Sequence, residues 1–315
     1  MSGLLHWVFA PGLFDSDAVR TAVLVGGAVA VVSGMVGVLT VIRGQSFAGH
    51  ALADVGATGG SGAFLIGLNP LWGFIGIAVV AAGIMESVGV RRPRGRDLAT
   101  GIVLGAGLGL AALFLYWDTT WSNTTGASIT VLFGSMFVIS GSTVPVIVGF
   151  AVFVLAVVML LYRMLLLSSL HPDLAAARGV PVRLVGVCYL AALAVTVSLS
   201  AMTIGAVLST ALLIGPAATA LRLTRRPGWA MAVSSAIAVG TTWLGILLAY
   251  DSYSWPPLQR GWPVSFFVVV LVFAGYLLTH LPGTGPRRAR RTPSPKTAAP
   301  TTAAPAGLVN TRTEA

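Results

Sequence analysis

The chain is built from apolar runs about 20 residues long, which short polar segments separate. A helix of about 20 apolar residues crosses the ~30 Å hydrocarbon core of a bilayer. Nine such runs can be placed, at roughly 20–42, 46–68, 70–90, 98–117, 144–167, 184–201, 203–221, 229–250 and 262–281. Because the runs are continuously apolar, without the alternation of a transmembrane β-strand, the sequence predicts an all-α polytopic transmembrane helical bundle of about eight to nine spans.

Charge supports this reading and orients the spans. Only 9% of the residues are charged, against about 25% in soluble domains, which excludes a water-soluble globular protein. All but one of the 19 basic residues are arginines, and they cluster between spans, as is typical of cytoplasmic loops rather than of nucleic-acid binding. With the predicted spans between them, four clusters lie on one side of the membrane: Arg91–Arg96, Arg178–Arg183, Arg222–Arg226 and Arg287–Arg291. The sequence therefore predicts a multi-pass protein in membrane lipid, with a cytoplasmic C-terminus and no nucleic-acid partner. The high content of Ala, Gly and Arg is typical of a GC-rich bacterial genome, so the expected location is a bacterial cytoplasmic membrane.

The segments outside the spans divide the chain further. Residues 1–19 lack the basic region of a signal peptide and are predicted to be an N-terminal lead-in to the transmembrane domain, residues 20–281. Residues 128–142 are apolar but too short to cross, which indicates a re-entrant or interfacial segment. From residue 282 to 315 the composition turns to Pro, Thr, Ala and Arg without apolar periodicity, which predicts a disordered cytoplasmic tail.

The scarcity of lysine and cysteine excludes several kinds of site. The only lysine, Lys296, lies in the tail, so the chain has no P-loop and no nucleotide site of its own. A single cysteine, Cys188, excludes a disulfide framework and a cysteine-rich metal cluster. We therefore expect neither an enzyme nor a permanently bound cofactor.

One pair of ionisable residues lies well inside a predicted span. His50 and Asp54 are four residues apart, so they project from the same face of a helix, and Ser46 continues that face one turn earlier. Ionisable residues inside a membrane are costly and mark candidate functional sites. An imidazole and a carboxylate at this spacing can bind a transition metal or relay a proton. They can equally be a mutually satisfied pair that packs two helices, and the spacing alone leaves these alternatives open.

Small residues and one proline carry a second pattern. Gly101, Gly105 and Gly109 repeat every four residues on one helix face, which favours close helix packing. Pro216 stands inside an apolar run and can kink or interrupt that helix.

Four segments, in order along the chain, resemble the metal-ion ABC transporter permeases, the zinc, manganese and iron uptake family. They are RGQSFAGHALADVGATGGSGAFLIGLNPLWG (43–73), RDLATGIVLGAGLGLAALFL (96–115), SSLHPDLAAARGVPVRL (168–184) and MTIGAVLSTALLIGPAATALRLTR (202–225). Family members usually carry an acidic residue four positions before the histidine of the first segment. Here that position is Ser46, and the resemblance then assigns the carboxylate to Asp54 and the metal ligands to His50, Asp54 and Ser46.

The resemblance implies a permease subunit that pairs with a second copy of itself and binds two cytoplasmic ATPase subunits, which hydrolyse ATP. It also implies an extracytoplasmic metal-binding protein that delivers the cargo. The cytoplasmic loop of the third segment should form a short helix that docks on the ATPase. The residues it assigns to this coupling loop are Pro172, Asp173, Leu174, Ala175, Ala176, Arg178 and Gly179.

The leading hypothesis is thus the permease of an importer for a divalent metal, zinc first, with manganese or iron behind it. The second is a stand-alone proton-coupled or facilitative transporter that uses His50 and Asp54 as a relay. The third is a membrane scaffold in which that pair only packs helices. Dependence of uptake on ATP and on an ATPase subunit separates the first two.

Overall fold

The computed structural model describes residues 16–89, 93–121, 125–134, 136–254 and 261–281. All of the regular structure in these ranges is helical. The first half contains α2 (Asp17–Ile42), α3 (Ser46–Leu65), α4 (Pro70–Gly89), α5 (Pro93–Trp121), α6 (Thr125–Phe133) and the short 3-10 turns η2 (Met136–Val138) and η3 (Gly141–Thr143). The second half contains α7 (Val144–Leu170), α8 (Pro172–Ala177), α9 (Val182–Ile204), α10 (Ala206–Leu223), α11 (Pro227–Asp251), η4 (Ser252–Ser254) and α12 (Val264–Leu278).

The long helices coincide with the predicted spans, so the all-α bundle is confirmed. Seven of the described helices are long and apolar enough to cross a membrane by length and composition. The two remaining predicted spans are α3, which is rich in small and polar residues, and α12, which has only 15 residues. The lead-in and the tail lie almost entirely outside the described residues, and their assignment stays a prediction.

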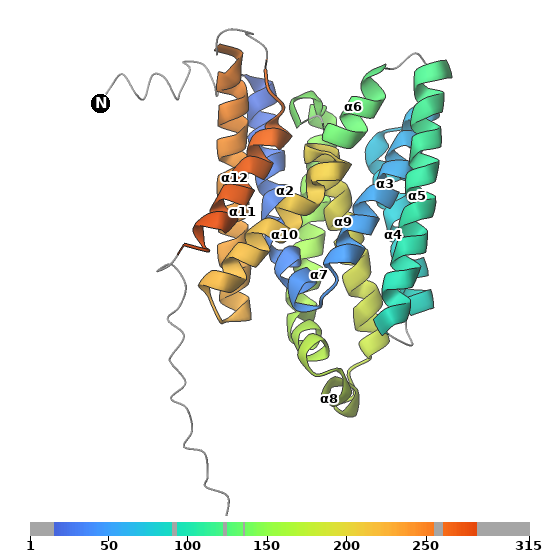
Figure 1. Cartoon of the computed structure of the whole chain (residues 1–315), viewed down its shortest axis with the longest axis vertical. Helices are drawn as coiled ribbons and strands as arrows, with labels where there is room; N and C mark the ends of the chain where they lie inside the picture. Colours follow the sequence, from blue (N-terminus) through green and yellow to red (C-terminus); the bar gives the residue numbers. More distant parts are fainter. Residues whose placement is uncertain (1–15, 90–92, 122–124, 135, 255–260, 282–315) are drawn as a thin grey trace, which may run out of the picture. The chain divides into compact units, whose positions relative to one another are not determined.

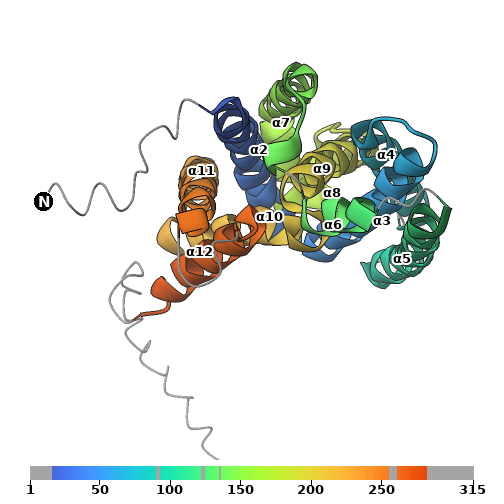
Figure 2. The same cartoon turned by 90° about the horizontal axis from the view of Figure 1, so that it is seen from above.

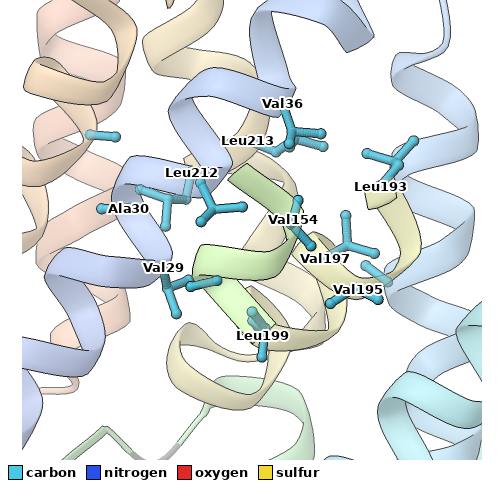
Figure 3. Packing of buried hydrophobic residues seen from close by; sticks show 14 of the residues in the cluster. Val29, Ala30, Val36, Val154, Leu193, Val195, Val197, Leu199, Leu212 and Leu213 are labelled. Atoms are coloured by element: carbon cyan, nitrogen blue, oxygen red, sulfur yellow. The ribbon is translucent and has the colours of Figure 1, made fainter. Parts of the chain in front are cut away.

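The core lies around α2 and α9, the two most deeply buried of the membrane-length helices. Seen from above, α11 and α12 lie on one side of them and α3, α4 and α5 on the other (Figure 2). Branched aliphatic side chains fill the space between the central helices, with Val36 of α2 beside Leu213 of α10 (Figure 3). By contrast, α5 and α7 keep most of their surface open.

Glycines set the closest helix approaches. A Cβ on Gly59 of α3 would lie 1.9 Å from the carbonyl oxygen of Gly73 in α4, and a Cβ on Gly37 of α2 would lie 1.9 Å from that of Leu213. The expectation for Gly101, Gly105 and Gly109 is wrong within one copy of the chain. A Cβ at each of these positions would meet nothing within 4 Å among the described residues, because this stripe lies on the open face of α5.

A short helix follows α5, as the segment 128–142 predicted, although it begins three residues earlier. Nine residues form α6, which packs against α3, α5, α9 and α10 at the end of the bundle opposite α8 (Figure 1). It ends at Gly134 (φ +79°), whose Cβ would collide with Thr203 at the end of α9. Gly205 (φ +101°) separates α9 from α10, and its Cβ would collide with Leu132 of α6. These conformations are open to glycine and strained for other residues.

The interruption therefore falls at Gly205 and not at Pro216. Pro216 lies inside α10, which continues as one helix from Ala206 to Leu223. Proline removes one backbone hydrogen bond there without ending the helix.

The ends of the helices agree with the arginine pattern. In Figure 1, α8 and the turns that join α2 to α3 and α10 to α11 lie at the same, lower end. Arg43, Arg178 and Arg222 stand at these three connections. The side chains of the cluster at 91–96 and of the cluster at 287–291 lie outside the described residues. The assignment of this arginine-rich end to the cytoplasm stays a prediction.

Candidate functional site

The structure brings His50 and Asp54 together on α3. Nε2 of His50 lies 3.4 Å from Oδ2 of Asp54, as the spacing of four residues predicts. The Asp54 residue is 7% exposed, whereas 43% of the His50 side chain is accessible. Ser46 is the first residue of the helix and is half-buried, one turn before His50. The pair thus joins a buried carboxylate to an imidazole at the open side of the helix.

The turn before α3 determines where this helix begins. Gly44 adopts φ +66°, a left-handed conformation that allows the chain to reverse directly after α2. The carbonyl of Gln45 then accepts the amide of Gly49 at 3.0 Å and starts the helix. Gly49 also permits a close approach to α10, because its Cβ would lie 2.9 Å from a methyl group of Leu213.

Polar and small residues hold the middle of α3 against α5. The hydroxyl of Thr58 donates a hydrogen bond to the carbonyl of Gly107 at 2.7 Å. A Cβ on Gly107 would lie 2.5 Å from the Val55 side chain, so only glycine fits this contact. Asp54 is consequently carried on a helix fixed by its neighbours, which limits how far the carboxylate can move.

The imidazole has one nitrogen in use within this chain. His50 Nε2 faces Asp54, while Nδ1 is buried and has no hydrogen-bond partner among the described residues. An unsatisfied buried polar atom costs about 1–3 kcal/mol. Within the described residues, no group of three or more His, Cys, Asp or Glu side chains is arranged to hold a metal ion. Among the described residues, this site therefore brings together one imidazole and one carboxylate, two groups that are capable of binding a transition metal.

The predicted short helix of the loop after α7 is present as α8. Pro172 opens it, Asp173 lies exposed in its first turn, and Gly179 (φ +75°) follows its end. Its alanines differ in environment: Ala175 is fully buried, whereas Ala176 is exposed. A charged residue at Ala175 would thus disturb packing, and Ala176 is the position where a substitution acts on the outer surface alone. Leu174 and Arg178 are also exposed.

Comparison with known proteins identifies relatives over most of the chain. The model of the ABC 3 transport family matches residues 15–274. The manganese transport system membrane protein MntC of Halalkalibacterium halodurans is 31% identical over 211 residues, which are 67% of this chain and 70% of that protein. The high-affinity zinc uptake system membrane protein ZnuB of Haemophilus influenzae is 25% identical over 241 residues, 75% of this chain and 90% of that protein.

A solved structure shows the same architecture. PsaBC from Streptococcus pneumoniae, determined in complex with Fab, superposes with a TM-score of 0.72 and 25% sequence identity. The match covers 85% of this chain and 92% of that one. The described residues therefore share their overall fold with this solved structure.

Proposed function

Because the chain belongs to the ABC 3 transport family, we propose that it is the membrane-spanning permease of an ATP-binding-cassette importer for a divalent transition metal. The family match confirms the resemblance drawn from the four sequence segments. The observation that carries the choice of cargo is the His50–Asp54 pair, two transition-metal ligands 3.4 Å apart on one transmembrane helix.

The cargo we propose is zinc, with manganese or iron as the next candidates. Imidazole nitrogen and carboxylate oxygen bind all three ions, and selectivity among them depends on geometry and metal availability. Relatives named for manganese transport and for zinc uptake both support a divalent metal. A conducting site must release its ion, so we expect the metal to bind here only transiently.

A second copy of the chain completes the ligand set in this proposal. Two ligands per copy, repeated by a two-fold axis, give four ligands along a shared pathway. Four is the usual coordination number of zinc in proteins. Ser46, one turn nearer the arginine-rich end, adds a weak oxygen ligand or holds a water molecule.

ATP hydrolysis belongs to partner subunits, since the chain has no P-loop lysine. We place those ATPase subunits at the arginine-rich end, against the exposed residues of α8, with the C-terminus on the same cytoplasmic side. An extracytoplasmic metal-binding protein delivers the ion at the opposite end.

The test is uptake of Zn²⁺ and Mn²⁺ by cells that lack their own importers and express this chain with its ATPase and binding protein. We expect accumulation of a divalent metal that stops when the ATPase carries an inactivating substitution in its own nucleotide site. Equal uptake with the active and inactive ATPase would contradict the proposal and support the stand-alone transporter. Competition between the two ions in the same cells ranks them as cargo.

A substitution on α8 tests the coupling loop. We expect Ala176→Glu to reduce uptake by about fivefold or more, because coupling between sites typically corresponds to 5–150-fold and this exposed position lies on the proposed docking surface. Basal ATPase activity should persist. Ser87→Glu, an exposed small residue at the same end of the bundle, is the matched control and should transport normally. Unchanged metal-stimulated ATP hydrolysis and uptake in Ala176→Glu would exclude α8 as the docking element.

A further inference from the structure

Arg43 connects three parts of the fold at the arginine-rich end. It follows the last residue of α2, and its guanidinium donates hydrogen bonds to the hydroxyls of Ser168 at 3.2 Å and Ser169 at 3.1 Å, near the end of α7. It also donates to the side-chain oxygen of Gln45 at 3.3 Å, in the turn before α3. The same guanidinium lies 4.7 Å from the ring centre of Tyr189 in α9.

The two serine oxygens are oriented to accept from Arg43. Both hydroxyls donate to the carbonyl of Leu165, one turn earlier in α7. With the hydroxyl hydrogens used inside the helix, the oxygen lone pairs remain for the guanidinium. The two serine oxygens therefore require a hydrogen-bond donor at position 43, and an apolar side chain has none.

Tyr189, whose ring faces the same guanidinium, is also held in place by a hydrogen bond. Its side chain is 1% exposed, and its hydroxyl donates to the hydroxyl oxygen of Thr40 in α2 at 2.9 Å. A guanidinium is planar, so it can stack on this ring and donate to several acceptors at once, whereas an ammonium group cannot reproduce both contacts. Position 43 therefore requires the planar guanidinium of arginine and not only a positive charge.

The contacts of Arg43 lie next to both elements of the proposed function, α8 and the helix that carries the His50–Asp54 pair. Ser168 and Ser169 precede α8 by a few residues, Tyr189 lies in the helix that follows α8, and Arg43 stands directly before the helix of the His50–Asp54 pair. Ala175 of α8 is fully buried, and α8 packs against α7 and α9.

We propose that Arg43 is the positioning residue that ties both flanks of α8 to the start of α3, so that movement imposed on α8 by the ATPase reaches the metal ligands. The inference rests on the proposed function, since it needs α8 to be the ATPase contact and His50 and Asp54 to be the ligands. Arg43 itself touches no cargo; it acts through the position of α3.

The experiment compares the wild-type complex, with its ATPase, with complexes carrying Arg43→Gln or Arg43→Lys. The measurement is the number of metal ions taken up per ATP hydrolysed, together with basal ATPase activity and thermal stability. For Arg43→Gln we expect the ratio to fall about fivefold or more, with basal ATPase activity unchanged. Arg43→Lys should recover only part of the ratio, because it restores the charge but not the planar group. Arg225→Gln, an exposed arginine at the same end, is the control and should leave the ratio unchanged.

The outcomes separate this inference from the proposed function. If the wild-type complex neither transports metal nor couples it to ATP, the proposed function fails. If the wild type is coupled and Arg43→Gln keeps the wild-type ratio, the positioning role is overturned. Should Arg43→Gln lose stability, the double variant Ser168→Ala/Ser169→Ala removes two acceptors and keeps the arginine. A wild-type ratio in that double variant overturns the inference, and a lowered ratio at normal stability supports it.

Discussion

Replacing His50 and Asp54 together by alanine is expected to lower metal uptake by about tenfold or more, with the permease still present in the membrane. Even residues that only orient metal ligands are worth about 10–100-fold in affinity or activity, and these two are the proposed ligands themselves. Both side chains are shortened without a new charge, and the described residues contain no cluster of three or more His, Cys, Asp or Glu side chains that could replace the pair. The measurement is uptake of Zn²⁺ and Mn²⁺ normalised to the amount of permease in the membrane.

Two further variants make the result specific. Asp54→Asn keeps the shape and a hydrogen-bonding oxygen beside His50 but removes the charge, so we expect most of the loss with little effect on stability. His280→Gln changes an exposed histidine near the end of α12, remote in sequence from the pair, and should transport normally. Near-normal transport in the double alanine variant would show that the pair only packs helices.

The largest effect on folding is expected for Gly59→Ala. The added Cβ would lie 1.9 Å from the carbonyl oxygen of Gly73, and the reciprocal contact from Gly73 is 2.0 Å. Because both neighbours are helix backbone, they cannot rotate away as a side chain can. We expect a loss of at least about 3 kcal/mol, the upper end of typical overpacking costs, measured as a lower melting temperature or as loss of folded protein in detergent.

Gly105→Ala is the matched control in α5. It makes the same chemical change inside another long helix, but a Cβ there would meet nothing within 4 Å among the described residues. Alanine also has the higher helix propensity, so stability should be retained. Equal melting temperatures for the Gly59 variant and the wild type would contradict the close α3–α4 contact.

The sequence predicted features that depend on local periodicity and on the membrane. Apolar runs located the long helices, and arginine counts located the connections at one end, because both follow from the cost of placing polar groups in hydrocarbon. The His50–Asp54 contact was also predictable, since residues four apart in a helix are neighbours wherever the helix lies. Pro172 and Gly179 likewise marked the short helix of the loop after α7.

Features that depend on which helices meet could not be predicted in this way. Nothing in DLAAAR distinguishes the buried Ala175 from the exposed Ala176. Among the described residues, an added Cβ on the regularly spaced glycines, such as Gly105, meets no atom within 4 Å. Gly59 and Gly73, which show no shared pattern, form the tight crossing. Arg43 could be placed only at the arginine-rich end, because its partners Ser168 and Tyr189 are more than a hundred residues away in sequence. Many membrane proteins have an arginine directly before a span and two adjacent serines elsewhere in the chain. This pattern alone therefore does not indicate that the arginine contacts the serines.

The composition of α3 has a consequence for how the protein is made. This helix is not among those apolar enough to cross a membrane by the criteria that its neighbours meet, and it carries Asp54 near its middle, where an aspartate costs about 2.5–3.5 kcal/mol on insertion scales. The many glycines and alanines of α3 contribute little favourable insertion free energy, so they offset little of the cost of Asp54 when the helix is surrounded by lipid. The turn to α4 spans only residues 66–69, and α4 provides the tightest contact of α3 through Gly59 and Gly73. We therefore expect the translocon to release α3 as a hairpin with α4 rather than alone, so that the helix with the least affinity for lipid enters the bilayer with its packing partner already beside it.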